Sequence, residues 1–291
     1  MARQPGKFTN EQLFCWEQVD KTNRLFRVSH AFAPSDHRGK LLPLYALLSV
    51  VEEASSRFSE EQIARGKLAW WRQEILGRDP GSNSHPVIAE LSRNARLGPR
   101  QIGCVERLLE DAESRLDEPP PASLEDLRRR CSKVSQPQME LELRLCGAEE
   151  PDMTGAAAGQ GARRGLLQLL RESLRAQETG AFWWLPLDLL ARHGVSRAEV
   201  RRAPGAESAQ AMFNDLLAEG LAWGEGRRPL RENNGGPADA LSHLTVHGEL
   251  QSRLLLRLQG RPAERYGAEL GRATLADLYH AWKTARRVNR L

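Results

Sequence analysis

The sequence predicts an all-α protein, because its apolar residues recur at intervals of three and four and strict alternation is hard to find. Two stripes show this helical spacing most clearly, Leu41, Leu44, Tyr45, Leu48 and Val51 in the first and Leu166, Leu169, Leu170 and Leu174 in the second. Segments rich in glycine, proline, asparagine and serine separate the predicted helices. These segments are 77–86, 117–123, 147–155, 201–208 and 231–237.

Local signals indicate where helices begin and which faces they bury. Ser123 and Ser196 each precede acidic residues in the following turn, which is the pattern of a helix N-cap. Trp70 and Trp71 share a helical segment, and because adjacent helical positions are ~100° apart, we expect one ring in the core. Residues 155–165 are rich in glycine and alanine, so two alternatives stay open: a flexible loop, or a helix start that allows close packing.

Composition narrows the class of protein. The 291 residues, 40% of them hydrophobic, suit one globular body, so we expect a single domain over residues 1–291. The net charge of +4 is spread along the chain and predicts no nucleic-acid partner. Four cysteines without metal-ligand spacing fit a reducing compartment. No run approaches the ~20 apolar residues that span a bilayer. We expect a cytoplasmic protein, with peripheral contact to a membrane left open.

Few short motifs point to chemistry. Residues 41–60 place Glu52 and Glu53 within an otherwise apolar run, where they could mark a metal site or a solvated seam. His243 and His247 have the spacing of two zinc ligands on one helix face, but no convincing third ligand accompanies them. The chain has no GxSxG motif and no dinucleotide-binding glycine pattern. These patterns assign no catalytic residue.

The order of several segments along the chain is more informative than any one of them. These segments are SHAFAPSDHRGKLLPLYALLSVVEEASSR, KLAWWRQEI, HPVIAEL, LLQLLRESL and WWLPLDLLARHGV. Together they resemble the squalene/phytoene synthase family, most clearly over residues 25–195 and more weakly in the C-terminal helices, 206–291.

The resemblance implies an isoprenoid synthase-type helical bundle around a central cavity. In that family, two acid-rich helices hold Mg²⁺ against the diphosphates of prenyl substrates, which are coupled head to head. Oxygen ligands suit Mg²⁺, and carboxylates at i, i+3 and i+4 share one helix face. Carried over by position, the substrate-binding residues would be Ser29, Arg38, Tyr45, Gln168 and Arg171. The metal positions would be Glu52, Glu53 and Glu172.

Both acid-rich motifs depart from the family pattern. In the first, glutamates replace the two adjacent aspartates, the third carboxylate position is Ser56, and the preceding arginine is Ser49. Glu60 lies too far along the helix to share the same ion. In the second motif, Glu172 follows Arg171 as expected. The remaining departures are Gly165 and Gln168 ahead of that pair, Ala176 at the next carboxylate position and Phe182 in place of a basic residue.

Three hypotheses therefore remain. The first is a non-catalytic member that binds an isoprenoid or a protein partner, similar to degenerate members that assist respiratory complex I assembly; it needs no cofactor. The second is a working prenyl transferase that uses prenyl diphosphates, Mg²⁺ and an unusual set of ligands. The third is a helical scaffold without a ligand. The shortage of carboxylates favours the first.

Overall fold

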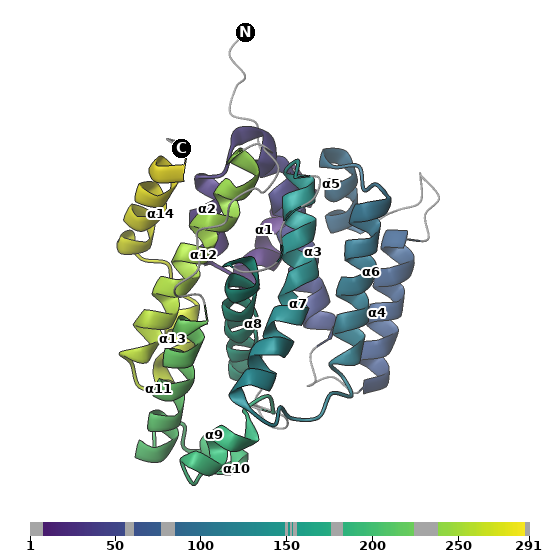
Figure 1. The fold of residues 1–291 in the computed structure, drawn as a ribbon. Coiled ribbons are helices and arrows are strands. Elements are labelled where there is room, and N and C mark those ends of the chain that lie inside the picture. Colours follow the sequence, from purple (N-terminus) through teal and green to yellow (C-terminus); the bar gives the residue numbers. More distant parts are fainter. Residues whose placement is uncertain are drawn as a thin grey trace.

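The computed structural model describes residues 8–55, 61–76, 85–148, 151, 153, 156–175, 183–223 and 238–288. Every regular element in these ranges is a helix, which confirms the all-α prediction (Figure 1). The helices are α1 (Asn10–Thr22), α2 (Leu25–Ala31), α3 (Ser35–Ala54), α4 (Glu61–Leu76), α5 (Pro86–Asn94), α6 (Pro99–Ser114), α7 (Leu124–Leu145), α8 (Ala156–Arg175), α9 (Leu187–Arg192), α10 (Arg197–Arg202), α11 (Glu207–Ala222), α12 (Ala238–Gln259), the 3₁₀ turn η1 (Ala263–Arg265), α13 (Tyr266–Leu270) and α14 (Leu275–Val288).

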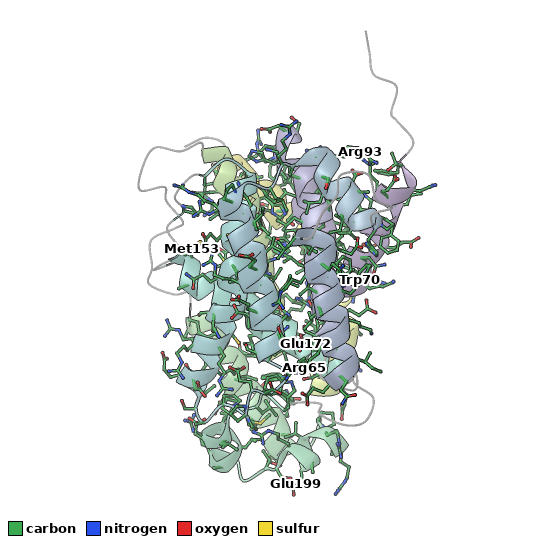
Figure 2. All side chains as sticks on the ribbon, turned by 90° about the vertical axis from the view of Figure 1, so that its right-hand side faces the viewer. Arg65, Trp70, Arg93, Met153, Glu172 and Glu199 are labelled. Atoms are coloured by element: carbon green, nitrogen blue, oxygen red, sulfur yellow. The ribbon has the colours of Figure 1, made fainter. Side chains whose placement is uncertain are left out.

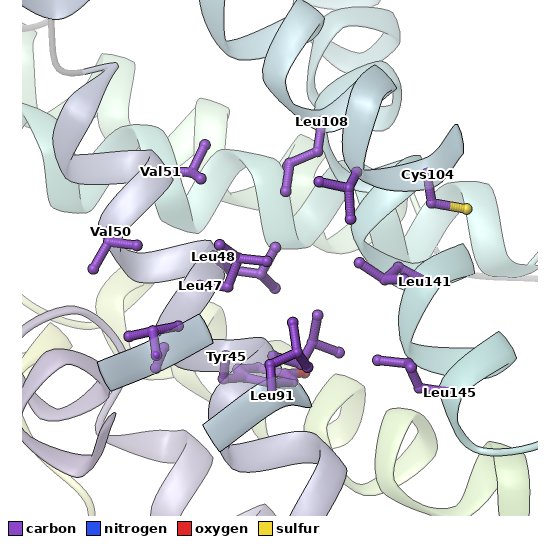
Figure 3. Packing of buried hydrophobic residues seen from close by; sticks show 14 of the residues in the cluster. Tyr45, Leu47, Leu48, Val50, Val51, Leu91, Cys104, Leu108, Leu141 and Leu145 are labelled. Carbon is purple, nitrogen blue, oxygen red and sulfur yellow. The ribbon is translucent and has the colours of Figure 1, made fainter. Parts of the chain in front are cut away.

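The helices enclose two hydrophobic clusters. The first is built mainly from α1 and α3–α7, with Leu47, Leu108 and Leu141 at its centre (Figure 3). The second is built mainly from α8, α9, α11, α12 and α14, and includes Leu166, Phe213 and Leu250. Helices α7 and α8 pack along each other in the middle of the molecule (Figure 1). Residues of these two helices therefore face both clusters.

Two predicted helix starts are confirmed. The Ser123 hydroxyl accepts a hydrogen bond from the backbone N–H of Asp126 at 3.1 Å and caps α7. The Ser196 hydroxyl accepts from the N–H of Glu199, whose carboxylate accepts in return from the N–H of Ser196, which forms a capping box at α10. Each cap satisfies backbone donors that the first helical turn would otherwise leave unpaired.

The glycine-rich stretch before the leucine stripe is helical from Ala156 onward, which confirms the close-packing alternative; Gly155 lies outside the described residues. At Gly165, a Cβ atom would lie 2.6 Å from the carbonyl oxygen of Cys131 and 2.8 Å from its Cα. Only glycine permits this contact between α8 and α7. At Gly161, one turn earlier, the nearest atoms would be 3.5 Å away, which is ordinary contact.

The tryptophan pair on α4 divides as predicted. Trp71 is 6% exposed and belongs to the first cluster, while Trp70 is 44% exposed and lies on the outer surface of the helix (Figure 2). The second pair behaves in a similar way, since Trp184 is fully buried and Trp183 is partly buried. The indole N–H of Trp184 donates to the Ser173 hydroxyl at 2.6 Å, which fixes the chain after α8 against that helix.

The four cysteines are buried and form no disulfide. Among the residues that the structure describes, no helix combines the length and apolar character required to cross a bilayer.

Candidate functional site

The first acid-rich motif lies in the last turn of α3. Glu52 is buried, but the neighbouring Glu53 is exposed, because adjacent helical residues point to different sides. Ser49, at the position where the resemblance predicts an arginine, is also buried. Its hydroxyl donates to the Tyr45 carbonyl at 2.8 Å and lies 2.5 Å from the Thr22 hydroxyl. Ser56 and Glu60 lie outside the described residues.

The second motif lies near the end of α8, where Gln168 and Glu172 are buried and Arg171 is half-buried. The Gln168 amide donates to the Glu172 carboxylate at 3.3 Å across one helical turn. The other positions at this end, Ala176, Glu178 and Phe182, lie outside the described residues.

An arginine outside both motifs connects the two motif helices. Arg115 is the C-cap residue of α6 and is 7% exposed. Its guanidinium donates to the Glu172 carboxylate at 3.1 Å and to the Ser55 hydroxyl at 2.8 Å, immediately after α3. The Ser55 hydroxyl in turn donates to the Glu52 carbonyl at 3.3 Å. A cationic side chain therefore stands between the helices that would have to share Mg²⁺.

The residues that the structure describes do not fit a Mg²⁺ site. Glu172 is already paired with a buried guanidinium, and Glu53 points to solvent rather than toward α8. Nowhere in the described ranges do three acidic, histidine or cysteine side chains come together as a set that could hold a metal ion. Ions of this kind need several oxygen ligands in a fixed octahedral arrangement.

The cavity that described residues line beside the second motif is small. A mostly apolar cavity of about 20 Å³ lies between α7, α8 and the Trp183–Trp184 turn, and Gln168 and Arg115 lie on its wall. This volume holds about one water molecule. A larger hollow of about 410 Å³ opens between the ends of α1 and α8 and helix α13. Lys21, Arg24 and Arg171 line it together with Ala268 and Leu270.

Two of the carried-over positions, Ser29 and Tyr45, belong to a buried polar network centred on Glu142 of α7. Tyr45 donates to one Glu142 oxygen at 2.9 Å, and the His243 Nδ1 lies 2.6 Å from the other. The His243 Nε2 and the His247 Nδ1 each lie 3.0 Å from the Ser29 hydroxyl. The network therefore joins α2, α3, α7 and α12 through side chains that are almost completely enclosed.

Arg164 of α8 extends the same network. Its guanidinium lies 3.7 Å from Glu142 and 5.0 Å from the centre of the Tyr45 ring. Burial acts to raise the pKa of Glu142, but the charge and hydrogen bond of His243, with Arg164 and Tyr45, outweigh it and hold that pKa below its usual value. Burial, followed by the positive charges of His243 and Arg164, lowers the pKa of His247 well below its usual value. His247 is therefore neutral near pH 7.

The atoms of Ser29, His243 and Glu142 follow the order of a hydrolase triad, with hydroxyl to Nε2 and Nδ1 to carboxylate. The Ser29 side chain is fully buried, and neither cavity described above is lined by it. It also donates to the Phe26 carbonyl at 3.1 Å, within its own helix. We assign this network to the packing of the helix bundle. His243 and His247, which have zinc-ligand spacing, hydrogen-bond Ser29 instead.

Arg38 lies apart from both the motif helices and the network. It is exposed, and its guanidinium donates to the carbonyls of Ala33 and Ala31 at the end of α2. The structure thus brings Gln168, Arg171 and Glu172 together on α8, places Ser29 and Tyr45 in the buried network, and separates Arg38 from both.

Sequence reasoning missed Glu142, Arg164 and Arg115. Glu142 had a usable signal, because it lies three residues after Met139 and four before Cys146, on the apolar stripe of α7. An acid at a core position of a helix needs buried partners. Arg115 had no such signal, since it lies among acidic residues that resemble a solvated helix end.

The regular elements of the described residues are all helices, and their bundle has the isoprenoid synthase-type fold. The sequence profile of the Squalene/phytoene synthase family matches residues 19–288, so the chain belongs to that family. A dehydrosqualene synthase solved in complex with a ligand is similar in structure, with a TM-score of 0.67, 16% identity and coverage of 96% of this chain and 95% of that one. Squalene synthase HpnC from Alicyclobacillus acidocaldarius gives a TM-score of 0.59 at 16% identity, covering 89% of this chain and 94% of its own. A search of curated protein sequences gives no match.

Proposed function

We propose that this protein is a non-catalytic member of the squalene/phytoene synthase family that binds an isoprenoid diphosphate without coupling two of them. The observation that carries this proposal is the position of Arg115. Its guanidinium lies between the two motif helices and binds the one described carboxylate of the second motif. Ionisation of a prenyl diphosphate needs metal ions that neutralise the leaving group.

Electrostatics oppose a metal ion at this place. A divalent cation about 4 Å from a guanidinium is repelled by roughly 8 kcal/mol at an effective dielectric constant of about 20. Among the described residues, the two or three carboxylates that would offset this repulsion do not come together, since Glu53 is exposed, Glu172 already balances Arg115, and Glu52 belongs to no group that could hold a metal ion. Arg115 thus supplies a permanent positive charge at the place where catalytic members would require a bound metal ion.

The hollow between α1, α8 and α13 supports binding of one diphosphate. Lys21, Arg24 and Arg171 line it together with one acid, Asp20, whose carboxylate is paired with Arg27. Guanidinium groups suit phosphate oxygens because they donate two parallel hydrogen bonds. Its volume of about 410 Å³ exceeds that of the cavity beside Gln168 by far. The apolar side chains of Ala268 and Leu270 provide contact for the first part of a prenyl chain.

The test combines ligand binding with a search for turnover. Farnesyl diphosphate should raise the Tm of the purified protein equally with Mg²⁺ and with a chelator, since a ligand at a hundred times its Kd adds about 2.7 kcal/mol. Arg24→Gln and Arg171→Gln should remove most of that shift. Arg192→Gln, which changes an exposed arginine on α9, should retain it. No pyrophosphate and no coupled hydrocarbon should form with Mg²⁺ or Mn²⁺.

Turnover that Glu53→Ala abolishes would overturn the proposal and establish a working prenyl transferase. A variant in which the metal-binding carboxylates are restored provides a second test of the proposal. Arg115→Ala together with Ser56→Asp, Ala176→Asp and aspartate at positions 52, 53 and 172 should make the Tm depend on Mg²⁺. The same set of changes with Arg115 retained should not, because the guanidinium still repels the ion.

A further inference from the structure

The exposed face of α14 carries an apolar stripe of unusual size. Leu275, Leu278, Tyr279 and Trp282 are 86%, 45%, 55% and 43% exposed. Their spacing of three and four residues places them on one side of the helix. Tyr279 and Trp282 lie 5.9 Å apart between ring centres, so the stripe is continuous along about two turns. Monomeric proteins seldom expose a contiguous patch of this kind without a binding role.

All exposed charged side chains of α14 are basic. Lys283, Arg286 and Arg287 are exposed in its last turns, and the Arg286 guanidinium lies 4.9 Å from the centre of the Trp282 ring. The one acid of the helix, Asp277, is 1% exposed and forms an ion pair with Arg257 at 3.0 Å. What the helix presents to solvent is therefore apolar and cationic.

The inner face holds α14 in a fixed orientation. Ala281, Thr284 and Ala285 are buried where α14 packs against α12. The Thr274 hydroxyl and the Asp277 carboxylate bind each other's backbone N–H groups, which fixes the start of the helix. The face of α14 that packs on α12 is therefore distinct from the apolar stripe, and the stripe is the outer face of a helix held in place.

A groove of about 380 Å³ lies beside the stripe, between α14 and the end of α2. Phe32 and Trp282 supply apolar walls, and Arg38 and Arg286 lie on its lining. The Arg38 guanidinium already donates to the Ala31 and Ala33 carbonyls, so Arg286, next to the aromatic walls, is the group that suits a phosphate joined to a hydrocarbon chain.

We propose that α14 and this groove, which we call the α14 surface, dock the protein on a membrane that contains anionic phospholipids. Tryptophan and tyrosine prefer the headgroup level of a bilayer, and basic residues add attraction to anionic lipids. A second copy of the chain is a poorer occupant, because a symmetric contact would bring two sets of three basic residues together. Lysine is also depleted from protein interfaces. The α14 surface lies on the far side of the molecule from α4 (Figure 1).

The full-length protein should pellet with sucrose-loaded vesicles of phosphatidylglycerol and phosphatidylcholine, and much less with phosphatidylcholine alone. Because each basic residue near the surface contributes about 1 kcal/mol, Lys283→Gln, Arg286→Gln and Arg287→Gln together should weaken binding roughly 100-fold. The double change Tyr279→Ser and Trp282→Ser should also weaken binding. Raising the NaCl concentration from about 50 to about 500 mM shortens the Debye length about threefold and should release the wild type from the vesicles.

Matched control variants distinguish binding through the α14 surface from nonspecific binding through exposed apolar or charged residues elsewhere. Ile63→Ser removes an equally exposed apolar side chain from α4 and should pellet as the wild type. Arg192→Gln, Arg201→Gln and Arg202→Gln remove three exposed charges from α9 and α10 and should also have little effect. Circular dichroism melts check that every variant folds. Equal binding to neutral vesicles, or unchanged binding of the α14 variants, would overturn the proposal. So would a dimer in light scattering that Trp282→Ser dissociates, since it would assign the surface to a second copy.

Discussion

The guanidinium of Arg115 and the carboxylate of Glu172 lie 3.1 Å apart, with side chains only 9% and 8% exposed. They come from the end of α6 and from α8, 57 residues apart in the sequence. Because Arg115 also donates to Ser55, this pair connects three helices at one point. The Glu172 carboxylate, which the resemblance predicts as a metal position, is therefore used in an internal ion pair.

Removing the cation of this pair should destabilise the fold. Arg115→Ala leaves the Glu172 carboxylate buried without its counter-charge, which typically costs about 3–5 kcal/mol. Arg115→Met combined with Glu172→Gln should recover much of the loss, because no uncompensated charge remains. Urea denaturation followed by circular dichroism measures both. Arg129→Ala, which breaks an exposed pair with Asp126 on α7, should change stability far less. Equal effects of Arg115→Ala and Arg129→Ala would contradict this interpretation.

Two glycines one turn apart on α8 should respond in opposite directions to alanine. Gly165→Ala places a methyl group 2.6 Å from the Cys131 carbonyl, so α7 and α8 must move apart, at a cost of about 1–3 kcal/mol. Gly161→Ala meets only ordinary contacts at 3.5 Å and should stabilise the helix by up to ~1 kcal/mol. Thermal melts of the two variants provide the comparison. Stabilisation by both would show that the close approach at Gly165 is not required.

Stability should decrease as the pH falls below about 6.5, the usual pKa of histidine. Burial lowers the pKa of His30 to about 4 and that of His247 well below its usual value. Burial lowers the pKa of His85 as well. The unfolded chain therefore binds more protons than the folded one, and His30 and His247 together contribute a loss of stability of up to roughly 2.7 kcal/mol per pH unit between about pH 6 and 4.5. The lowered pKa of Glu142 continues this loss below the usual glutamate value.

His247→Gln should reduce that slope by up to roughly 1.4 kcal/mol per pH unit whatever its effect on stability at neutral pH, because the proton-binding difference of one histidine disappears. The half-exposed His280 of α14 is the control, and His280→Gln should leave the slope unchanged. Urea midpoints measured from pH 7.5 to 4.5 give the slopes. An unchanged slope in His247→Gln would show that the buried imidazole is protonated in the folded state.

The tryptophan pair of α4 gives a simpler test of the fold. Trp71→Ala should cost about 3–5 kcal/mol, because it leaves a cavity in the first hydrophobic cluster. Trp70→Ala should cost much less, since that ring is nearly half exposed. Chemical denaturation distinguishes the two, and similar small losses would place both rings outside the core.

Local patterns predicted the helices, and distant contacts decided the site. The spacing of Leu166, Leu169 and Leu170 and the cap at Ser123 act within a few residues, so they can be recognised in the sequence and are confirmed in the structure. Arg115 meets partners 57 and 60 residues away, and no periodicity relates such positions. The resemblance located Tyr45, but only the fold shows that its hydroxyl donates to Glu142 of α7.

The contact at Gly165 also fixes the position of α8 along α7. Glu172 follows it by seven residues, or ~10 Å along the helix axis at ~1.5 Å per residue. Because α8 touches the backbone of α7 at that glycine, the helix cannot slide along its neighbour without a collision. The position of the Glu172 carboxylate along α7 is thus determined two turns away, at Gly165, which has no Cβ atom. The same contact determines how far the Arg115 side chain must extend to reach that carboxylate.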